Sequence, residues 1–465
     1  MKWDHIVKNG TIVTSTDSYQ ADIYIKDGKI AAVSTVDLGS DAHEITDASG
    51  KFVLPGFIDT HTHSRDGSKG AHHKEDFAHS SAAGAASGIT TIYEMPNSTP
   101  AIYNVAMLND LIETITPKAY VDFGVWGLCI GLNNADLIPL AEAGVVAFKL
   151  FWGYALDHDY QLIYNYQEGM KDVFPPLDEG QIYEVFREVA KTGKLLAIHA
   201  ENFDIIKLLT EEVKASGDTS YAAMLRSRPA VTENIIIETG IALSRELGTR
   251  LHIAHLASGE GADLIRNAQE EGLNVTGETC PQYLALTDKD GDRLGSLIKG
   301  YPPVRDKYHQ DKLWEGLLDG TLPFVCSDHA PHLYEEKKKS LWEAPAGNTT
   351  IETMPLVMIN FVNQGRLSIN DLVSVLSEQP ARMFGTYPMK GSLEVGTDAD
   401  IVVIDMNKEY TFSQESMHSR TKLSPYDGWE MVGKPVKTIL RGKTIMVDGE
   451  IVGEPSGKFI RPIED

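Results

Sequence analysis

The chain has 465 residues, and its 66 acidic against 42 basic side chains give a formal net charge of −24 with histidine neutral. This excess argues against non-specific binding to nucleic acid or to anionic membrane surfaces, because both attract cationic proteins. Hydrophobic residues make up 42% and charged residues 23% of the chain, which is typical of a folded globular protein. This composition argues against disorder and low complexity.

The cysteine pattern and the apolar runs indicate the compartment. Three cysteines, Cys129, Cys280 and Cys326, lie far apart and are odd in number, so they form no disulfide framework and favour a reducing environment. The first residues lack the basic flank and apolar stretch of a signal peptide. No run reaches the roughly 18 apolar residues that a membrane span requires. We therefore expect a cytoplasmic protein with no membrane or nucleic-acid partner.

The two ends of the chain have the same β-like pattern. Residues 1–55 alternate apolar and polar positions and contain Asn9-Gly10 and Asp27-Gly28 as turn signals, which predicts short antiparallel strands. Residues 385–465 contain further strand-like runs and another hairpin turn at Asp448-Gly449. We infer that these two segments form one small β-sandwich domain, followed by a carboxyl-terminal tail, and that they bracket the rest of the chain.

Residues 56–384 have a different pattern, in which short apolar runs alternate with segments of helical period. This alternation predicts helices packed around a parallel sheet, an α/β fold. Eight strands are expected, at 57–60, 89–95, 121–127, 145–151, 195–198, 251–254, 273–278 and 322–327. Eight such units match a TIM (β/α)8 barrel, whose active site lies at the carboxyl ends of the strands. The long stretches 154–178 and 329–348 are candidate lids.

Side chains that can bind or surround a metal lie at the ends of five of these strands. His61 and His63 are one residue apart, so a strand places both imidazoles on one face, which suits two ligands of one ion. A lone buried histidine is usually a core residue, but convergence on one barrel mouth indicates a metal centre. His252 is expected to face away from this centre, because an odd number of positions separates it from His255. The candidate ligands are His61, His63, Lys149, His199, His255 and Asp328.

Lys149 is the most informative of these residues. An ammonium cannot ligate a metal and is costly to bury, so one interpretation is a lysine that pairs with an acid at the barrel mouth. The other is that carbon dioxide adds to the amine and gives an anionic carbamate, whose two oxygens bridge two divalent ions. Nitrogen and oxygen ligands of borderline hardness favour zinc, and manganese or cobalt would also fit.

Motifs along nearly the whole chain resemble those of the cyclic amidohydrolases, the family of dihydroorotases, hydantoinases, dihydropyrimidinases and allantoinases. The matching segments are PGFIDTHTH at 55–63, AFKLF at 147–151, HAEN at 199–202, ETCPQY at 278–283, SDHAPH at 327–332 and GTDAD at 396–400. The resemblance implies a hydrolase that opens a cyclic amide with a metal-bridging hydroxide. It also implies that His61, His63, carboxylated Lys149 and Asp328 hold one ion, and that Lys149, His199 and His255 hold the other.

The same resemblance suggests how the ring amide is attacked. Asp328 would accept the proton of the hydroxide and deliver it to the departing nitrogen, or it would serve as a ligand alone. Tyr154 resembles the tyrosine with which dihydropyrimidinases and hydantoinases stabilise the oxyanion, and the alternative is an aromatic residue of the lid.

The signals for the identity of the ring disagree. Arg65, Asn97 and His332 resemble the groups with which dihydroorotases hold the substrate carboxylate, a task that suits the planar fork of arginine. The alternative for Arg65 is an ion pair behind the substrate. The HAEN segment, Tyr154 and residues 424–428 resemble hydantoinases and allantoinases more, while Tyr301 and residues 346–350 depart from both patterns. We expect a hydantoinase-like or allantoinase-like enzyme for rings with an acidic substituent, with dihydroorotase as the alternative.

Two other classes share parts of this pattern. A mononuclear deaminase of the wider superfamily would need no bridging lysine, and a non-catalytic scaffold would have lost metal ligands. Because all six candidate positions are occupied, we predict two divalent ions per chain. The expected partner is a small cyclic amide, and the resemblance implies a homo-oligomer, either a dimer or a tetramer.

Overall fold

Parallel strands form a closed barrel at the centre of the computed structural model, which describes residues 2–163 and 166–463. The third barrel strand is interrupted at Trp126, whose backbone N–H donates to Glu94 O at 3.0 Å. The ring closes where Thr62 pairs with His329 in parallel, next to a hydrogen bond from Ser327 N to Asp59 Oδ1 of 3.0 Å. The barrel strands are β8 (Phe57–Thr62), β9 (Ile89–Glu94), β10 (Asp122–Val125) with β11 (Gly127–Leu128), β12 (Phe148–Phe151), β16 (Leu195–His199), β17 (Arg250–Ile253), β18 (Val275–Thr279) and β19 (Phe324–Val325).

These strands confirm the expected TIM barrel, with small shifts at their ends. Residues 273–274 precede β18 because Leu273 N donates to Ala268 O at 3.0 Å and so closes the preceding helix. The lower barrel interior is filled by large side chains, among them Tyr93, Trp126 and Phe324. His252 stacks on Phe324 with ring centroids 5.3 Å apart, and both rings lie in this lower layer.

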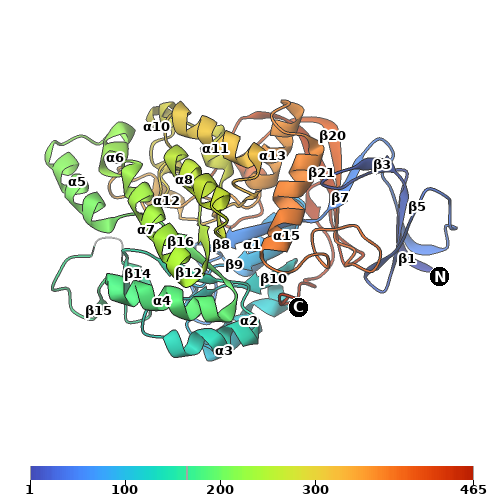
Figure 1. The fold of residues 1–465 in the computed structure, drawn as a ribbon. Coiled ribbons are helices and arrows are strands. Elements are labelled where there is room, and N and C mark those ends of the chain that lie inside the picture. Colours follow the sequence, from blue (N-terminus) through green and yellow to red (C-terminus); the bar gives the residue numbers. More distant parts are fainter. Residues whose placement is uncertain (1, 164–165, 464–465) are drawn as a thin grey trace.

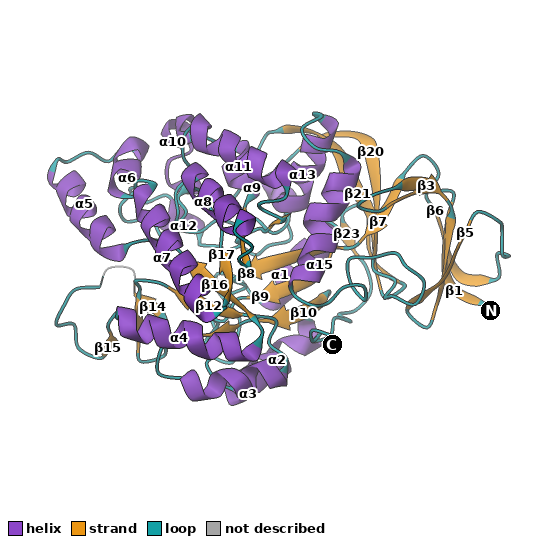
Figure 2. Cartoon of the chain, viewed as in Figure 1, coloured by secondary structure: helices purple, strands orange, loops and turns teal. Residues whose placement is uncertain are grey.

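Helices surround the barrel (Figure 2). Their sequences carry local start and stop signals: Asp178 caps helix α4 by accepting from Gln181 N at 2.8 Å, and Gly193 ends it at a φ of 66°. The helices are α1 (Phe77–Ala86), α2 (Val105–Ile115), α3 (Leu137–Ala143), α4 (Glu179–Thr192), α5 (Phe203–Ala215), α6 (Tyr221–Ser227), α7 (Val231–Leu247), α8 (Gly259–Glu270), α9 (Pro281–Ala285), α10 (Asp288–Leu294), α11 (Lys307–Asp319), α12 (Tyr334–Lys337), α13 (Thr353–Asn363), α14 (Ile369–Val373) and α15 (Gln379–Met383). Single turns are η1 (Thr116–Lys118), η2 (Asn134–Asp136), η3 (Gly295–Ile298), η4 (Ser374–Glu378) and η5 (Gln414–Ser416).

Strands from the amino-terminal and carboxyl-terminal parts of the chain meet in a separate pair of sheets beside the barrel (Figure 1). One sheet has the order β5-β4-β1-β6, and the other has the order β23-β22-β21-β20-β7-β2-β3, so the second joins strands from both termini. This arrangement confirms the expected β-sandwich. The strands are β1 (Trp3–Lys8), β2 (Thr11–Val13), β3 (Ser18–Gln20), β4 (Asp22–Lys26), β5 (Lys29–Ser34), β6 (Ala42–Asp47), β7 (Phe52–Pro55), β20 (Ile401–Thr411), β21 (Glu430–Leu440), β22 (Lys443–Val447) and β23 (Glu450–Ile451).

The expectation that all strands of residues 1–55 are antiparallel is wrong for two pairs. β1 pairs with β6 in parallel, and β2 pairs with β7 in parallel. The local turns at Asn9-Gly10 and Asp27-Gly28 specify only neighbouring strands, whereas β6 and β7 join strands from earlier in the chain. Apolar side chains from both termini, such as Ile23, Ile401 and Ile439, form the core of this domain.

The two candidate lids contain short elements. Residues 154–178 form a small sheet of β13 (Ala155–Asp157), β14 (Leu162–Ile163) and β15 (Val173–Phe174), and residues 164–165 of this stretch lie outside the described chain. Residues 329–348 contain α12. Across residues 2–163 and 166–463, no helix combines the length and apolar character needed to cross a membrane.

Candidate active site

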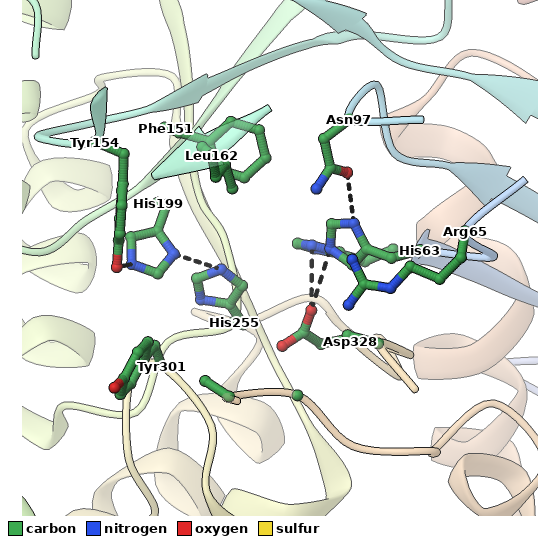
Figure 3. A pocket seen from close by; sticks show the side chains of 14 residues that line it. His63, Arg65, Asn97, Phe151, Tyr154, Leu162, His199, His255, Tyr301 and Asp328 are labelled. Atoms are coloured by element: carbon green, nitrogen blue, oxygen red, sulfur yellow. Dashed lines mark hydrogen bonds and ion pairs between the residues drawn. The ribbon is translucent and has the colours of Figure 1, made fainter. Parts of the chain in front are cut away.

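Two histidines and an aspartate form the first candidate ligand group at the carboxyl ends of the barrel strands, and Figure 3 labels His63 and Asp328 of this group. His61 lies in β8, His63 follows that strand, and Asp328 follows β19. The Nε2 atoms of His61 and His63 each lie 3.5 Å from Asp328 Oδ1. One potential ligand atom from each residue falls within 4.8 Å of the others, a spacing that suits a single cation.

A second pair of imidazoles lies across the same barrel mouth. His199 ends β16, and its Nδ1 lies 3.1 Å from Nε2 of His255, which follows β17 (Figure 3). His255 and Asp328 have positive φ angles of 38° and 47°, a left-handed conformation that costs energy for residues other than glycine. Such backbone strain concentrates at functional sites, and here it occurs at two of the predicted ligand positions.

Lys149 in β12 is fully buried near both groups. Its Nζ has no hydrogen-bond partner among the described residues, so the structure gives it no carboxylate to pair with. Burial lowers the pKa of Lys149 to about 8, and the nearby carboxylates of Glu278 and Asp328 oppose that shift. His61 Nε2 and His255 Nδ1 are likewise buried without a hydrogen-bond partner. Unpaired buried polar atoms are rare, and these atoms fit a site that binds cations.

Two acceptors orient the histidines of the first group. Glu278 Oε1 lies 2.6 Å from His61 Nδ1, and Asn97 Oδ1 lies 2.6 Å from His63 Nδ1. With each Nδ1 facing an acceptor, each Nε2 is left as the ligand atom. Burial alone would raise the pKa of Glu278, but His61 and His252 hold it well below its usual value. Asn97, which the sequence predicts as a substrate contact, thus also positions a candidate ligand.

A longer chain of contacts supports His199. Glu201 Oε2 lies 2.9 Å from His199 Nε2 and accepts from Arg228 Nη1 at 2.6 Å. The Arg228 guanidinium stacks on Tyr301, 3.4 Å from the ring centroid. Burial would raise the pKa of Glu201, but Arg228 and His199 lower it to about 2, so the carboxylate stays ionised. Tyr154 Oη approaches the same imidazole nitrogen at 3.3 Å.

The cavity above these residues is small, about 60 Å³, and Arg65, Asn97, Tyr154 and Tyr301 line its wall. Arg65 has a φ of 57°, its Nε is buried without a hydrogen-bond partner, and no ion pair joins it to a carboxylate of the described chain. The predicted alternative of an ion pair for Arg65 is therefore wrong for this part of the chain.

His332 lies farther out than the sequence suggests. Its Nε2 is 3.0 Å from Ala346 O and 3.4 Å from Arg65 Nη2, and it lines a neighbouring cavity instead of the small one. Burial and the nearby Arg65 cation lower the pKa of His332 to about 2, so the imidazole is neutral.

Sequence reasoning assigned no role to the acidic residues that hold the histidines. Glu278 lies in β18 and Glu201 lies two residues beyond β16. Acidic side chains at the carboxyl ends of barrel strands were the signal that could have identified them. The expectation that His252 faces away from this centre is wrong: its ring lies in the barrel interior, with Nε2 3.5 Å from Glu278 Oε2 and Nδ1 2.8 Å from Thr276 Oγ1. The alternation of side chains does not extend to His255, because β17 ends at Ile253 and His255 has a φ of 38°.

Known proteins share this combination of fold and site. A model described as "Amidohydrolase family" matches residues 52–445. The chain belongs to this family. It is 36% identical over 463 residues to an L-hydantoinase from Paenarthrobacter aurescens, and the match covers 98% of each chain. It is also 36% identical over 463 residues to an allantoinase from Rubrobacter xylanophilus, with 99% of this chain and 98% of the relative covered.

Solved structures of this amidohydrolase's relatives agree over the whole chain. An L-hydantoinase from Arthrobacter aurescens superposes with a TM-score of 0.92 at 36% identity, covering 99% of this chain and 100% of that one. A D-hydantoinase superposes with a TM-score of 0.89 at 31% identity, covering 98% of both chains. The predictions of a cyclic amidohydrolase fold and of a hydrolase for carbon–nitrogen bonds in cyclic amides are confirmed.

Proposed function

We propose that this amidohydrolase opens a ring of the hydantoin or allantoin type by hydrolysis of its amide bond. The observation that carries the proposal is the pair of facing ligand groups at one barrel mouth, with the unpartnered Lys149 buried near both. The full-length similarity to hydantoinases and allantoinases supports the same ring class.

We assign one divalent ion to His61, His63 and Asp328, and the second to His199 and His255. Lys149, carboxylated on its Nζ, would bridge both. Two observations support the fit of two ions and a carbamate to this site. Lys149 Nζ, His61 Nε2 and His255 Nδ1 are buried without a hydrogen-bond partner among the described residues. The pKa of Lys149 is lowered to about 8, which increases the fraction of neutral amine that can react with carbon dioxide. The nitrogen and oxygen donors favour zinc. When bound, two such ions supply hydroxide near neutral pH and polarise a carbonyl oxygen.

Asp328 is the proposed proton carrier. Although burial raises the pKa of a carboxyl, contacts with His63 and His61 hold the pKa of Asp328 well below its usual value. The carboxylate is therefore ionised at neutral pH, as a base must be. We assign to it the transfer of a proton from the nucleophile to the departing ring nitrogen, first as a base and then as an acid.

Tyr154 is the proposed donor to the oxygen on which negative charge develops. Its phenol lines the cavity and lies 3.3 Å from His199 Nε2, so its hydroxyl is close to the second ligand group. A hydrogen bond that strengthens as charge develops lowers the barrier of the reaction. The position at the cavity wall favours this role over that of a lid aromatic.

Arg65, Asn97 and His332 are the proposed substrate contacts. The Arg65 guanidinium lies at the edge of the cavity with its Nε unpaired and its Nη2 3.4 Å from the neutral His332 imidazole. Asn97 has its Oδ1 on His63, so its Nδ2 is the atom left for substrate. Arg65 has no ion pair with a carboxylate of the described residues, and this observation favours the second candidate function, dihydroorotase, because the planar guanidinium would fit a ring carboxylate. We further propose a cytoplasmic homo-oligomer, a dimer or a tetramer.

The test is a turnover panel on the metal-loaded enzyme, with dihydroorotate, hydantoin, 5-substituted hydantoins, dihydrouracil and allantoin as substrates. We expect hydrolysis of hydantoins or allantoin and two metal ions per chain by elemental analysis. Preferred turnover of dihydroorotate would support the alternative, and one ion per chain would favour a mononuclear deaminase. Absence of turnover with every ring would contradict the proposal.

A further inference from the structure

A second, larger cavity opens beside the proposed reaction site. Its volume is about 490 Å³, and it shares Arg65, Tyr301 and Ala346 with the small cavity above the ligand groups. Helices α5 and α6 form one wall, and residues 342–346 form another. A ring held at the ligand groups could therefore extend a substituent past Arg65 and Tyr301 into this space.

The walls of this outer cavity are cationic, although the chain carries a net charge of −24. Two acidic side chains, Glu211 and Glu343, face five basic ones. Only Arg228 of the five has an ion-pair partner within the described chain, the carboxylate of Glu201. A local excess of positive charge attracts anionic ligands. The basic residues are Arg65, Lys207, Lys214, Arg228 and Lys299.

Among the basic residues of this cavity that have no ion pair with a described carboxylate, Lys299 is the most buried, with only 3% of its surface exposed. Its Nζ donates to Leu341 O at 2.7 Å and to Ala344 O at 2.6 Å, so neutral carbonyls hold the ammonium without cancelling its charge. The Tyr301 ring lies 5.6 Å from Lys299 Nζ and stacks on Arg228. Tyr301 thus lines both cavities and has two cationic side chains, Arg228 and Lys299, close to its ring.

Part of the remaining wall of the cavity is apolar, and a hydrogen bond holds one of its aromatic side chains in place. Phe203, Met224 and Trp342 line it. Trp342 Nε1 donates to Asp218 O at 3.0 Å, which ties residues 342–346 to the connection between α5 and α6. Lys214 Nζ lies 5.3 Å from the centroid of the Trp342 ring. The wall therefore combines an aromatic surface with exposed lysines at its rim.

We propose that this outer cavity binds the exocyclic substituent of the ring and selects a carbon chain that ends in a carboxylate. The apolar wall would pack against the methylene groups, while Lys207 and Lys214 at the rim and Lys299 inside attract the anion. The proposal rests on the proposed function, because the ring must lie at the ligand groups for its substituent to reach this space.

The test compares two hydantoins of nearly equal shape, one with a 2-carboxyethyl group at position 5 and the other with the matching neutral amide, 2-carbamoylethyl. We expect the metal-loaded enzyme to prefer the acid at least about tenfold in kcat/KM, and added salt to reduce this preference. The double variant Lys207→Met/Lys214→Met should lower the preference about fivefold. Turnover of unsubstituted hydantoin should stay unchanged, because neither lysine lines the inner cavity.

A second double variant, Lys289→Met/Lys443→Met, is the matched control. It removes the same total charge at exposed positions outside the cavity and should leave the preference unchanged. Equal turnover of acid and amide by the wild-type enzyme, or a preference for the amide, would overturn the proposal, as would a preference that loss of both rim lysines leaves unchanged. If unsubstituted hydantoin and every other ring of the panel are inert with the wild-type enzyme, the proposed function itself fails, which is a distinct outcome.

Discussion

At the scale of single residues, the burial of Lys149 is the main observation behind the proposed chemistry. Charged lysines are rarely fully buried without a partner, because removing an ammonium from water costs several kcal/mol. Among residues 2–163 and 166–463, Lys149 Nζ has no hydrogen-bond partner, while two pairs of imidazoles are arranged around the same barrel mouth. The proposed anionic carbamate would remove this conflict, whereas an unmodified ammonium would repel both of the proposed ions.

Replacing Lys149 with methionine should separate metal binding from folding. We expect the metal content to fall from two ions to at most one per chain and kcat to fall by about a thousandfold or more, because the bridging ligand is lost. The unfolding midpoint of the metal-free protein should not fall, since an apolar side chain of similar length replaces a buried cation. Elemental analysis, kinetics and thermal unfolding test this. Retention of two ions by the variant would contradict a bridging role.

Arg65 should distinguish acidic rings from neutral ones. Replacing it with alanine is expected to raise KM for dihydroorotate or carboxylated hydantoins about tenfold or more, and for unsubstituted hydantoin less than about threefold, because only the anion loses a charged hydrogen-bond partner. Arg65→Lys keeps the charge without the planar fork and should fall between the two. Equal effects of Arg65→Ala on KM for both kinds of ring would contradict the proposal that Arg65 binds a carboxylate of the substrate.

The residues that the sequence made predictable are those whose position follows from local rules. His61 and His63 share a face because side chains alternate along β8, and Asp328 follows the last barrel strand. The partner of His61 was not predictable in this way, because Glu278 lies 217 positions away and their contact depends on barrel closure. The same holds for Arg228, which follows α6 and reaches Glu201 only in the folded chain.

At the scale of elements, the start of α1 fixes the segment that carries Arg65. Asp76 caps this helix by accepting from His79 N at 2.9 Å, and its carboxylate also contacts Arg420 from the carboxyl-terminal part of the chain. The neighbouring Glu75 accepts from Arg420 N at 3.2 Å. Arg420, from the carboxyl-terminal part of the chain, thus contacts both the first turn of α1 and the loop before it.

The Asp76 carboxylate should make stability depend on pH in the acid range. Burial raises its pKa, but His79 and Arg420 outweigh this and lower the pKa to about 2, from an ordinary value of 3.8. A lowered folded-state pKa means that the stabilisation is present above about pH 4 and is lost as the pH falls toward 2. Asp76→Asn should therefore lower the free energy of unfolding at pH 7 by about 1–2 kcal/mol.

Urea unfolding of the wild type and Asp76→Asn at pH 7 and pH 3 measures this effect, and the difference between the two proteins should shrink at the lower pH. Asp76→Ala serves as the comparison, because it removes the helix cap as well and should cost about 1 kcal/mol more at both pH values. If the free energies of unfolding of the wild type and Asp76→Asn differ by the same amount at pH 7 and pH 3, the charge of Asp76 does not contribute to stability.

For the molecule as a whole, a buried ionic cluster joins the barrel to the β domain. Lys390 Nζ lies 2.6 Å from Asp122 of β10, 2.9 Å from Asp398 and 2.7 Å from Asp400, next to the β domain strand β20. Arg441, after β21, contacts Asp122 as well. Asp398 and Asp400 belong to the GTDAD segment that resembles the family, so this motif has a role in assembly here. The domain limits at 55/56 and 384/385 stay predictions. The cluster connects the two predicted domains, because Asp122 belongs to the barrel segment while Lys390 and Arg441 belong to the carboxyl-terminal segment.

Removing Lys390 should destabilise both parts of the molecule together. Burial would lower the pKa of this lysine, but the three carboxylates raise it, so the ammonium is charged across the physiological range. Lys390→Met leaves buried carboxylates short of a partner and should cost about 3–5 kcal/mol of unfolding free energy. Lys29→Met is the matched control: Lys29 pairs with Asp398 at 2.6 Å, but its side chain is 42% exposed, so its loss should cost about 1 kcal/mol or less. Equal losses in urea unfolding would contradict the role of burial, and a separate transition for the β domain would show that the cluster does not couple the two parts.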